Sequence, residues 1–273
     1  MTGTVSTTAA AAGVGALLHG WRASRRRSQM DLALDVGISP RHLSFIETGR
    51  SRPSAAVLMA LAEGLGVPLR ERNRMLLAAG FAPRYSQQSL DDTGMLAVRA
   101  ALERLLLAHA PYPGLVLDRQ WNVMLANEPA KSLTALLPDS LTQPTLNIFR
   151  ASLHPQGFAA ITANFSQWAH YLLNTLQRAI DASGDPLLLA LQQEVRNYPN
   201  VRALNTLSAH PHEPAAASEL LVSCVLDLPV GRVSLFSTLT TFGTPRDITL
   251  DELCVELFYP ADGQSENLLR GTG

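Results

Sequence analysis

Apolar residues at the start of the chain recur at helical intervals, separated by residues that begin and end helices. A first helix is predicted by apolar residues three and four positions apart, namely Val14, Leu17, Leu18 and Trp21. Ser28 and Ser39 precede two further runs at capping positions, and Gly37 and Gly49 follow those runs, where glycine commonly ends a helix. The pattern predicts an all-α N-terminal domain of five helices over residues 14–81.

A different pattern begins near residue 92, where helical runs are mixed with β-rich runs. Helical spacing predicts helices over residues 93–110, 127–136, 165–180 and 186–195. The β-rich segments are a hairpin over 114–127 with its bend at 118–120, and runs at 219–228, 233–242 and 252–260. Short connections between strands favour antiparallel pairing. We therefore expect an α+β C-terminal domain with a five-stranded antiparallel sheet, the arrangement of a PAS-like sensor.

Composition limits the class of protein. Hydrophobic residues make up 47% of the 273 positions and charged residues 16%, which excludes global disorder. No apolar stretch reaches the 18 residues of a membrane helix and no signal peptide is visible, so we expect a cytoplasmic protein. The predicted organisation is a disordered tail (1–13), a helix-turn-helix domain (14–81), a linker (82–91), a second domain (92–265) and a tail (266–273).

The charge of the chain is divided unequally between its parts. The formal net charge is −1, which by itself argues against a polyanionic partner. Residues 1–84 nevertheless contain 11 arginines and five acidic residues, giving +6, and the remainder is −7. Such an asymmetry indicates a basic module that binds nucleic acid, joined to a part with another task.

The basic part contains the spacing of a helix-turn-helix unit. Counted from Gln29, a small residue is fifth (Ala33), glycine is ninth (Gly37), and apolar residues are fifteenth and eighteenth (Leu43 and Ile46). The small residue lets two helices cross closely, the glycine permits a left-handed turn, and the apolar pair holds the second helix on the first. Such a unit places its second helix in the major groove of DNA.

On these residues the chain resembles the Cro/C1-type helix-turn-helix family, also called the XRE family, over residues 15 to 80. The resemblance implies that Gln29 binds a phosphate and that Arg41, His42 and Ser44 approach base edges. Phe45 either touches a thymine methyl group or packs internally. Further DNA-binding candidates are Ser39, Arg50 and Arg52, the two arginines as phosphate contacts. Glu47 is expected to pair with an arginine or the local backbone, because phosphates repel a carboxylate.

A second resemblance rests on Pro111–Asn127, Leu146–Pro155 and Asn164–Arg178, which are similar to segments of the MmyB-like transcription regulators. The resemblance implies a PAS-like ligand-binding domain and a fatty-acid-like or other amphiphilic ligand. Such a ligand needs an apolar tunnel and a group for its head. Tunnel candidates are Trp121, Phe149, Phe165, Trp168, Leu172 and Phe236, and head-group candidates are Arg150, Asn164 and Arg178. Core packing is the alternative for each aromatic residue, and a structural salt bridge is the alternative for Arg150.

Other chemistry has weaker support. The usual catalytic motifs GxSxG, HExxH, GxxxxGK[ST] and GxGxxG are absent from the sequence. His210, His212 and Glu213 are the one cluster of metal-ligand types, and they lack a third histidine at helical spacing. Cys224 and Cys254 are expected to be buried free thiols, with a redox pair as the alternative if adjacent strands carry them. We therefore expect no metal or cofactor beyond a bound amphiphile.

The sequence thus predicts a ligand-responsive transcriptional regulator rather than an enzyme. Its partners would be a palindromic double-stranded DNA operator, read by a homodimer, and a small apolar or amphiphilic ligand, with no membrane. The alternative is a DNA-binding domain fused to an enzyme with an unrecognised hydrolytic or transfer site.

Overall fold

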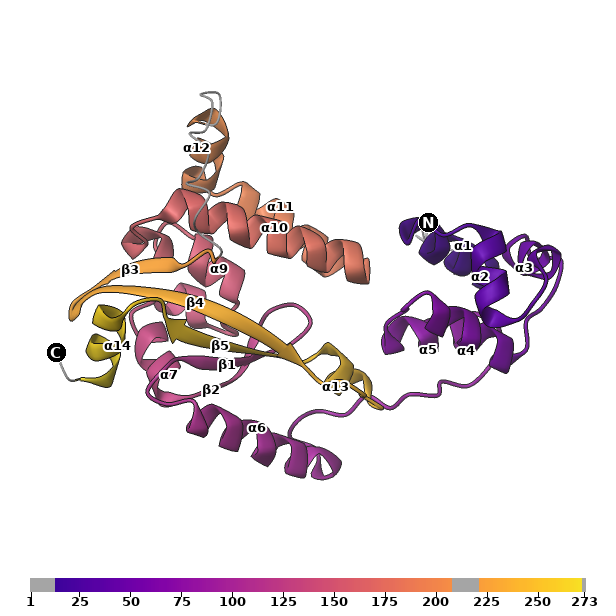
Figure 1. Ribbon diagram of the computed structural model, residues 1–273, viewed down its shortest axis with the longest axis horizontal. Coiled ribbons are helices and arrows are strands. Elements are labelled where there is room, and N and C mark those ends of the chain that lie inside the picture. The colour runs from indigo at the N-terminus through magenta and orange to yellow at the C-terminus, as the bar shows by residue number, and fades with distance from the viewer. Residues whose placement is uncertain (1–12, 208–220, 272–273) are drawn as a thin grey trace, which may run out of the picture. The chain divides into compact units, whose positions relative to one another are not determined.

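The computed structural model describes residues 13–207 and 221–271, and within them the chain forms two compact units (Figure 1). The first unit ends at Gln87 and also contains the distant segment Pro245–Asp251. The second unit begins at Gln88 and contains the rest of the described chain. The sequence pattern did not predict that a segment between two strands of the second unit belongs to the first.

Five helices make up residues 14–78 of the first unit, as predicted. They are α1 (Val14–Ser24), α2 (Gln29–Val36), α3 (Pro40–Glu47), α4 (Ala55–Gly64) and α5 (Leu69–Ala78). The Ser28 hydroxyl accepts a hydrogen bond from the backbone N–H of Asp31, and the Ser39 hydroxyl accepts one from His42, so both predicted caps are confirmed. Gly37 has a φ of 74°, the left-handed conformation that the turn between α2 and α3 requires. The core is formed by residues including Leu18, Leu32, Ala33, Leu43, Ile46, Leu58 and Leu61.

Helix α1 approaches the end of α3 at a glycine. A Cβ atom added to Gly15 would lie 2.5 Å from the carbonyl oxygens of both Ile46 and Glu47. No side chain fits at such a distance, so glycine permits the crossing of α1 and α3. The crossing also brings α1 close to Glu47, the last residue of α3.

The second unit is built around a five-stranded antiparallel sheet, as predicted. Its strands are β1 (Gly114–Leu117), β2 (Val123–Ala126), β3 (Cys224–Leu228), β4 (Gly231–Thr241) and β5 (Cys254–Pro260), in the spatial order β2-β1-β5-β4-β3. Its helical elements are η1 (Thr93–Met95), α6 (Leu96–Ala108), α7 (Glu128–Thr134), α8 (Asp139–Thr142), α9 (Ile148–Leu153), η2 (Phe158–Ile161), α10 (Phe165–Ser183), α11 (Pro186–Arg196), α12 (Pro199–Leu207) and α14 (Gly263–Arg270). Helix α13 (Ile248–Glu252) lies in the β4–β5 connection.

Helices cover both faces of this sheet (Figure 1). Buried residues of α9, α10 and α11 pack against one face, where Leu226 and Leu235 point. On the other face, the His109 ring just after α6 lies 4.8 Å from the Tyr259 ring. We call the face under α9 and α10 the inner face. Because side chains alternate along a strand, Glu256 and Phe258 of β5 share the inner face with their cross-strand neighbours.

Several boundaries differ from the sequence prediction. Residues 266–270 belong to α14 and are not a tail, because the Ser265 hydroxyl accepts a hydrogen bond from the backbone of Ser234 and holds α14 on β4. Strand β3 begins at Cys224, later than the apolar run that starts at Glu219. Residues 1–12 of the predicted tail (1–13) and the cluster of His210, His212 and Glu213 lie outside the described residues.

The two cysteines lie on strands that are not neighbours. Cys224 is on β3 and Cys254 on β5, and β4 lies between them. Both thiols are free, Cys224 is buried and Cys254 is partly exposed. The redox-pair alternative required adjacent strands, and the sheet order does not provide them.

Every helix in the described parts of the chain is too short or too polar to cross a lipid bilayer.

Candidate DNA interface and ligand cavity

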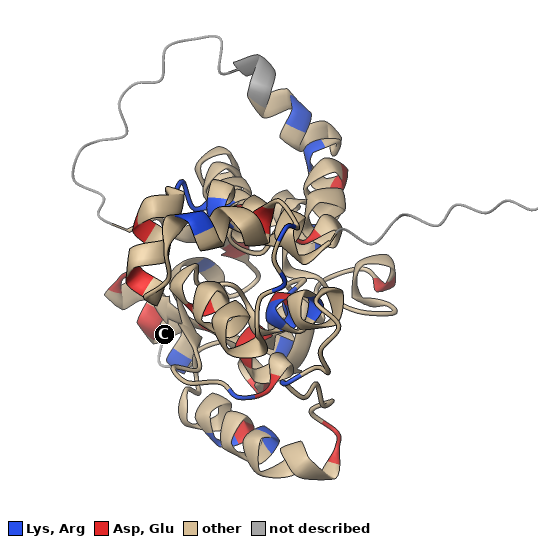
Figure 2. Cartoon of the chain, turned by 90° about the vertical axis from the view of Figure 1, so that its right-hand side faces the viewer, with Lys and Arg blue, Asp and Glu red and all other residues tan. Residues whose placement is uncertain are grey.

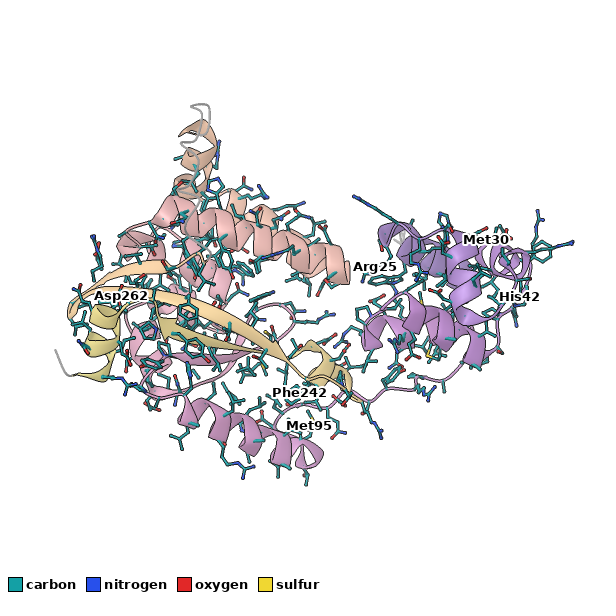
Figure 3. The ribbon with its side chains drawn as sticks, in the orientation of Figure 1. Arg25, Met30, His42, Met95, Phe242 and Asp262 are labelled. Carbon is teal, nitrogen blue, oxygen red and sulfur yellow. The ribbon has the colours of Figure 1, made fainter. Side chains whose placement is uncertain are left out.

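Helix α3 has one buried face and one face open to a partner. Leu43 and Ile46 are fully buried, and on the other side Arg41 is exposed. His42, labelled in Figure 3, is partly exposed. Ser39 caps the helix and Pro40 occupies its first turn, so α3 begins at a defined residue. The side chains of the first turn and a half are thereby held at the end of the helix that a helix-turn-helix unit presents to DNA.

Phe45 organises two of the candidate arginines. The Arg41 guanidinium lies 5.3 Å from the centre of the Phe45 ring, and the Arg50 guanidinium lies 6.0 Å from it. Cation–π contacts of this kind hold guanidinium groups in place without using their hydrogen-bond donors. Phe45 therefore positions charged neighbours, a role between the two alternatives that the sequence left open.

The sequence candidates Arg50 and Arg52 are exposed in the loop after α3, and Ser44 is partly exposed on α3. Figure 2 shows basic residues in blue and acidic residues in red, and both kinds occur on the helices. In the run 25–27, Arg27 pairs with Asp35 at 2.5 Å, and the Arg25 guanidinium lies over the Trp21 ring at 5.1 Å. These two arginines contribute to the structure of the unit.

Glu47 is the centre of a hydrogen-bond network that joins three helices. Arg22 of α1 donates two hydrogen bonds to its carboxylate, from Nε to Oε1 at 2.6 Å and from Nη2 to Oε2 at 2.9 Å. Gln29 at the start of α2 donates to Oε2 at 2.7 Å, and His19 Nδ1 lies 3.2 Å from the same oxygen. The prediction that Glu47 pairs with an arginine is confirmed.

This network changes the chemistry of both Glu47 and Gln29. Burial raises the pKa of Glu47, but the hydrogen bonds from Arg22, Gln29 and His19 outweigh burial and hold that pKa below its ordinary value. An amide nitrogen carries two hydrogens, and Glu47 accepts one of those of Gln29. The second hydrogen is the one that a phosphate could accept, so Glu47 orients the Gln29 side chain.

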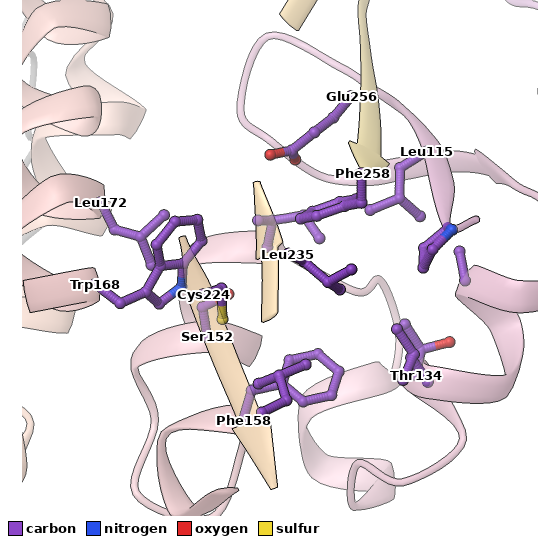
Figure 4. A pocket seen from close by; sticks show the side chains of 15 residues that line it. Leu115, Thr134, Ser152, Phe158, Trp168, Leu172, Cys224, Leu235, Glu256 and Phe258 are labelled. Carbon is purple, nitrogen blue, oxygen red and sulfur yellow. The ribbon is translucent and has the colours of Figure 1, made fainter. Parts of the chain in front are cut away.

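The second unit contains a largely apolar cavity with a volume of about 70 Å³ (Figure 4). The inner face of the sheet forms one wall, with Leu115, Leu226, Leu235 and Phe258. Helices α7, α9 and α10 and the short η2 form the others, with residues including Thr134, Ser152, Phe158, Trp168 and Leu172. Apolar pockets with a few polar groups are the usual form of small-molecule sites.

Glu256 places an ionisable side chain in the wall of this apolar cavity. It is only 7% exposed, and its Oε2 atom has no hydrogen-bond partner. Burial raises the pKa of Glu256 to about 7, and a hydrogen bond with Ser237 partly opposes that shift. Buried polar atoms are nearly always hydrogen-bonded in folded proteins, so Oε2 marks a position where a partner is missing.

Two of the nine sequence-predicted ligand residues, Trp168 and Leu172, line the cavity. Among the others, Trp121 and Phe149 pack edge-to-face at 5.0 Å, and Phe165 packs at the border of the core. Trp121 lies in the hairpin bend with a φ of 66°, which turns its ring toward Phe149. Phe236 alternates with the inward-facing Leu235, so it lies on the opposite face of the sheet and stacks on Tyr259. Each of these side chains thus packs against other protein side chains and lies outside the lining of the cavity.

The predicted head-group residues have partners outside the cavity. Arg150 forms a two-point ion pair with Glu194, at 2.8 and 2.7 Å. Asn164 joins the backbone of Ser223 and Val225 and so holds the start of β3. Arg178 donates to Thr175 at 3.0 Å on the exposed side of α10. The salt-bridge alternative for Arg150 is the one that the structure shows.

Sequence reasoning missed Glu256, although a signal for it exists. In the run Cys254–Pro260 the side chains alternate, and the inward positions are those of Glu256 and Phe258. A carboxylate at an inward position of an otherwise apolar strand is unusual and indicates a site. Within the described residues, no group of three or more metal-ligand side chains is present.

Comparisons with known proteins assign the chain to a family. The model described as MmyB-like transcription regulator ligand binding domain matches residues 98–271, and the model described as helix-turn-helix matches residues 19–72. HTH-type transcriptional regulators of Mycobacterium bovis and Mycobacterium tuberculosis are 37% identical over 65 residues. That match spans 24% of this chain and a quarter of the length of these relatives. Because the first match covers more than half of the chain, the chain belongs to the MmyB-like transcription regulators, with a helix-turn-helix domain ahead of the ligand-binding domain.

Proposed function

We propose that this protein is a DNA-binding transcriptional regulator that responds to a small ligand bound in the cavity beneath α9 and α10. The observation that supports this proposal most directly is the apolar cavity, which has one unpartnered carboxyl oxygen in its wall and lies in a unit that follows a helix-turn-helix domain. The inference of binding without catalysis rests on the family, whose members are regulators. The strand order and the helices between β2 and β3 support the PAS-like interpretation of the second unit.

In the DNA complex, Arg41 is placed to read a base edge and the loop arginines to bind phosphates. Arg41 is exposed on the open face of α3, and a guanidinium can bind guanine through two hydrogen bonds. His42 and Ser44 are the further base candidates, and Gln29, Ser39, Arg50 and Arg52 are the phosphate candidates. We infer a homodimer that reads a palindromic operator, with half-sites about one helical turn apart. Such a regulator acts in the cytoplasm, on the chromosome.

For the ligand, the family resemblance favours a fatty-acid-like amphiphile. The apolar walls of the cavity suit the hydrocarbon part of such a molecule. No arginine, lysine or histidine lines the cavity, so a carboxylate head would have no cation there. The ligand class is therefore argued separately below.

We infer that the chain segment between β4 and β5 couples the cavity to helix α5. Asp251 accepts a hydrogen bond from the backbone N–H of Leu69, the first residue of α5, at 2.9 Å. The N-cap of α5, Pro68, has no side-chain hydrogen bond to offer, so Asp251 supplies the cap from 182 residues away. The Ser86 hydroxyl donates to Asp247 at 2.7 Å and holds the same segment.

The strands on both sides of this connection line the cavity, since Leu235 is on β4 and Glu256 is on β5, five positions after Asp251. We infer that a ligand which displaces β5 alters the hydrogen bond between Asp251 and the backbone N–H of Leu69. The stability of α5 would change as a result. The affinity of the helix-turn-helix domain for its operator would then differ between the ligand-bound and ligand-free protein.

Selection of DNA from a random pool by the full chain tests the DNA half of the proposal, and enrichment of one palindromic sequence is expected. Leu172→Trp, which fills the cavity, tests the other half, with Leu107→Trp on the exposed part of α6 as the control. The filled variant should bind the selected sequence with a Kd that differs from those of the wild type and the control. No enriched sequence, or equal Kd values for all three proteins, would contradict the proposal.

A further inference from the structure

The unpartnered Oε2 atom of Glu256 restricts the chemistry of the ligand. We propose that the cavity binds a compact apolar molecule carrying a hydrogen-bond donor, a hydroxyl or amine, and that Glu256 accepts the hydrogen bond from that donor. This inference rests on the proposed function of the cavity as a ligand site. It replaces the acidic head group of a fatty acid with a donor.

The register of β5 places Glu256 in the wall of the cavity. Glu256 is paired with Leu115 on β1 and Leu239 on β4, so its side chain projects from the middle of the sheet. In Figure 4 Glu256, Phe258 and Leu115 lie on one side of the cavity, and Ser152 and Phe158 lie on the other. The carboxyl group therefore borders the cavity.

Only one of the two carboxyl oxygens of Glu256 has a hydrogen-bond partner. One interaction, with Ser237, is satisfied, and Oε2 has none. A buried polar atom without a partner destabilises an ordinary core. A donor on a ligand inside the cavity would supply the missing interaction, and in a low-dielectric site that interaction is strong.

The charge of the lining disfavours an anionic head at this position. The polar groups of the lining are those of Thr134, Ser152, Trp168, Cys224 and Glu256, and none of them is a cation. A carboxylate ligand would place a second acidic group beside Glu256, and two such groups in an apolar site cannot both be ionised. A hydroxyl or an ammonium group meets no such repulsion.

The volume of the cavity indicates a compact ligand. Pockets that enclose drug-sized molecules have volumes of about 300–1,000 Å³. The cavity here has about 70 Å³, and it is bounded by the rigid inner face of the sheet on one side. A long acyl chain exceeds this space, whereas a body of about four carbons is of the right order.

The test uses four small probes on the full chain: 1-butanol, butylamine, butanoate and diethyl ether. Diethyl ether is an isomer of butanol that lacks a donor. Binding is measured by ligand-observed NMR and by the shift in unfolding temperature. We expect 1-butanol and butylamine to bind at least about tenfold more tightly than butanoate and diethyl ether.

Variants of Glu256 separate its role from a general effect on the fold. Glu256→Leu should remove the preference for the donors and leave the affinity for diethyl ether within about twofold, which shows that the cavity is intact. Glu256→Gln keeps the shape and an acceptor, and should lower the affinity for butylamine at least about tenfold. Glu128→Gln, at a carboxylate that is 84% exposed, should leave the affinities of all four probes unchanged.

Three outcomes would overturn the proposal: butanoate binding as tightly as 1-butanol, an unchanged preference for donors in Glu256→Leu, or no binding of any probe to the wild type. Each of these leaves the DNA selection and the comparison of Leu172→Trp with Leu107→Trp unaffected. Failure of the ligand class is therefore distinguishable from failure of the proposed function.

Discussion

Arg22 on α1 holds Glu47 at the end of α3 through two hydrogen bonds, at 2.6 and 2.9 Å. The Arg22 side chain is 13% exposed and that of Glu47 is 4% exposed, so this ion pair is largely shielded from water. The pair fixes the last turn of the helix that is expected to lie in the major groove. Interactions inside the unit thus determine the orientation of the DNA-reading side chains.

Removal of Arg22 should therefore destabilise the first unit and weaken DNA binding without altering sequence preference. Arg22→Ala leaves a buried carboxylate without its main partner, at a cost of about 3 kcal/mol. Thermal unfolding and operator titration measure the two effects. Arg26→Ala, at an exposed arginine outside this network, is the control. A change in preferred base sequence for Arg22→Ala would argue against a purely positioning role.

Glu47 should make the first unit sensitive to acid. Its pKa in the folded protein is below the ordinary value of 4.5, so its stabilising effect is present above pH 4.5 and is lost as the pH falls through the folded-state pKa. Glu47→Gln should flatten the pH dependence of the free energy of unfolding below pH 4.5. Urea titrations of both proteins at a series of pH values test this, and parallel curves would contradict it.

The crossing of α1 and α3 provides a matched pair of glycine substitutions. Gly15→Ala introduces a methyl group 2.5 Å from two backbone oxygens and should destabilise by more than about 2 kcal/mol. Gly20→Ala is in the same helix with no atom within 4 Å and should stabilise by about 0.5–1 kcal/mol. Opposite shifts in unfolding temperature are expected. A shift of the same sign for both variants would show that α1 does not pack as described.

Arg41 and Arg50 should differ in how they affect recognition, although both contact the ring of Phe45. Arg41→Ala should cost roughly 1–3 kcal/mol on the operator and relax the preference at one base pair. Arg50→Ala should weaken binding to all sequences alike and reduce its salt dependence. Binding to the operator, to single-base variants and to random DNA is compared. Equal losses on every sequence for both variants would remove the base-reading role of Arg41.

Asp251 should carry the coupling between cavity and operator binding. Asp251→Ala removes the cap of α5, at a cost of about 1 kcal/mol in stability. The difference in operator affinity between wild type and Leu172→Trp should shrink when both proteins also carry Asp251→Ala. Asp227→Ala, which breaks an exposed ion pair with Arg232, is the control. An unchanged difference in the Asp251→Ala background would place the coupling elsewhere.

The cysteine thiols should be inert in the folded protein. Burial raises the pKa of Cys224 to about 12 and that of Cys254 to about 11, so little thiolate exists at pH 8. Iodoacetamide should modify neither thiol in the native protein, and both of the two cysteines after unfolding in guanidinium. Mass spectrometry gives the number of modified cysteines. Rapid modification of Cys224 in the native protein would show that β3 opens.

Local features were predictable from the sequence alone, because they depend on neighbouring residues. The caps at Ser28 and Ser39, the turn at Gly37 and the buried pair Leu43 and Ile46 follow from spacing along one helix or turn, and the structure confirms them. Strand pairing through short connections was predictable for the same reason.

The cavity and its chemistry depended on which distant residues meet in space. Aromatic residues of similar character divide between the cavity wall (Trp168), the core (Phe149) and the opposite face of the sheet (Phe236), and composition cannot distinguish these positions. Arg150 resembled a ligand anchor until its partner Glu194, 44 residues away, was placed beside it.

Thus the sequence by itself determined the helix-turn-helix unit, the family and the class of fold, because these follow from periodic patterns and local caps. Tertiary structure alone decided that Glu256 borders an apolar cavity with an unpartnered oxygen, and that Asp251 caps α5, a helix that begins 182 residues earlier in the chain. The reason is physical: burial and hydrogen-bond partnership are properties of the packed molecule, and one residue type takes different roles according to what surrounds it.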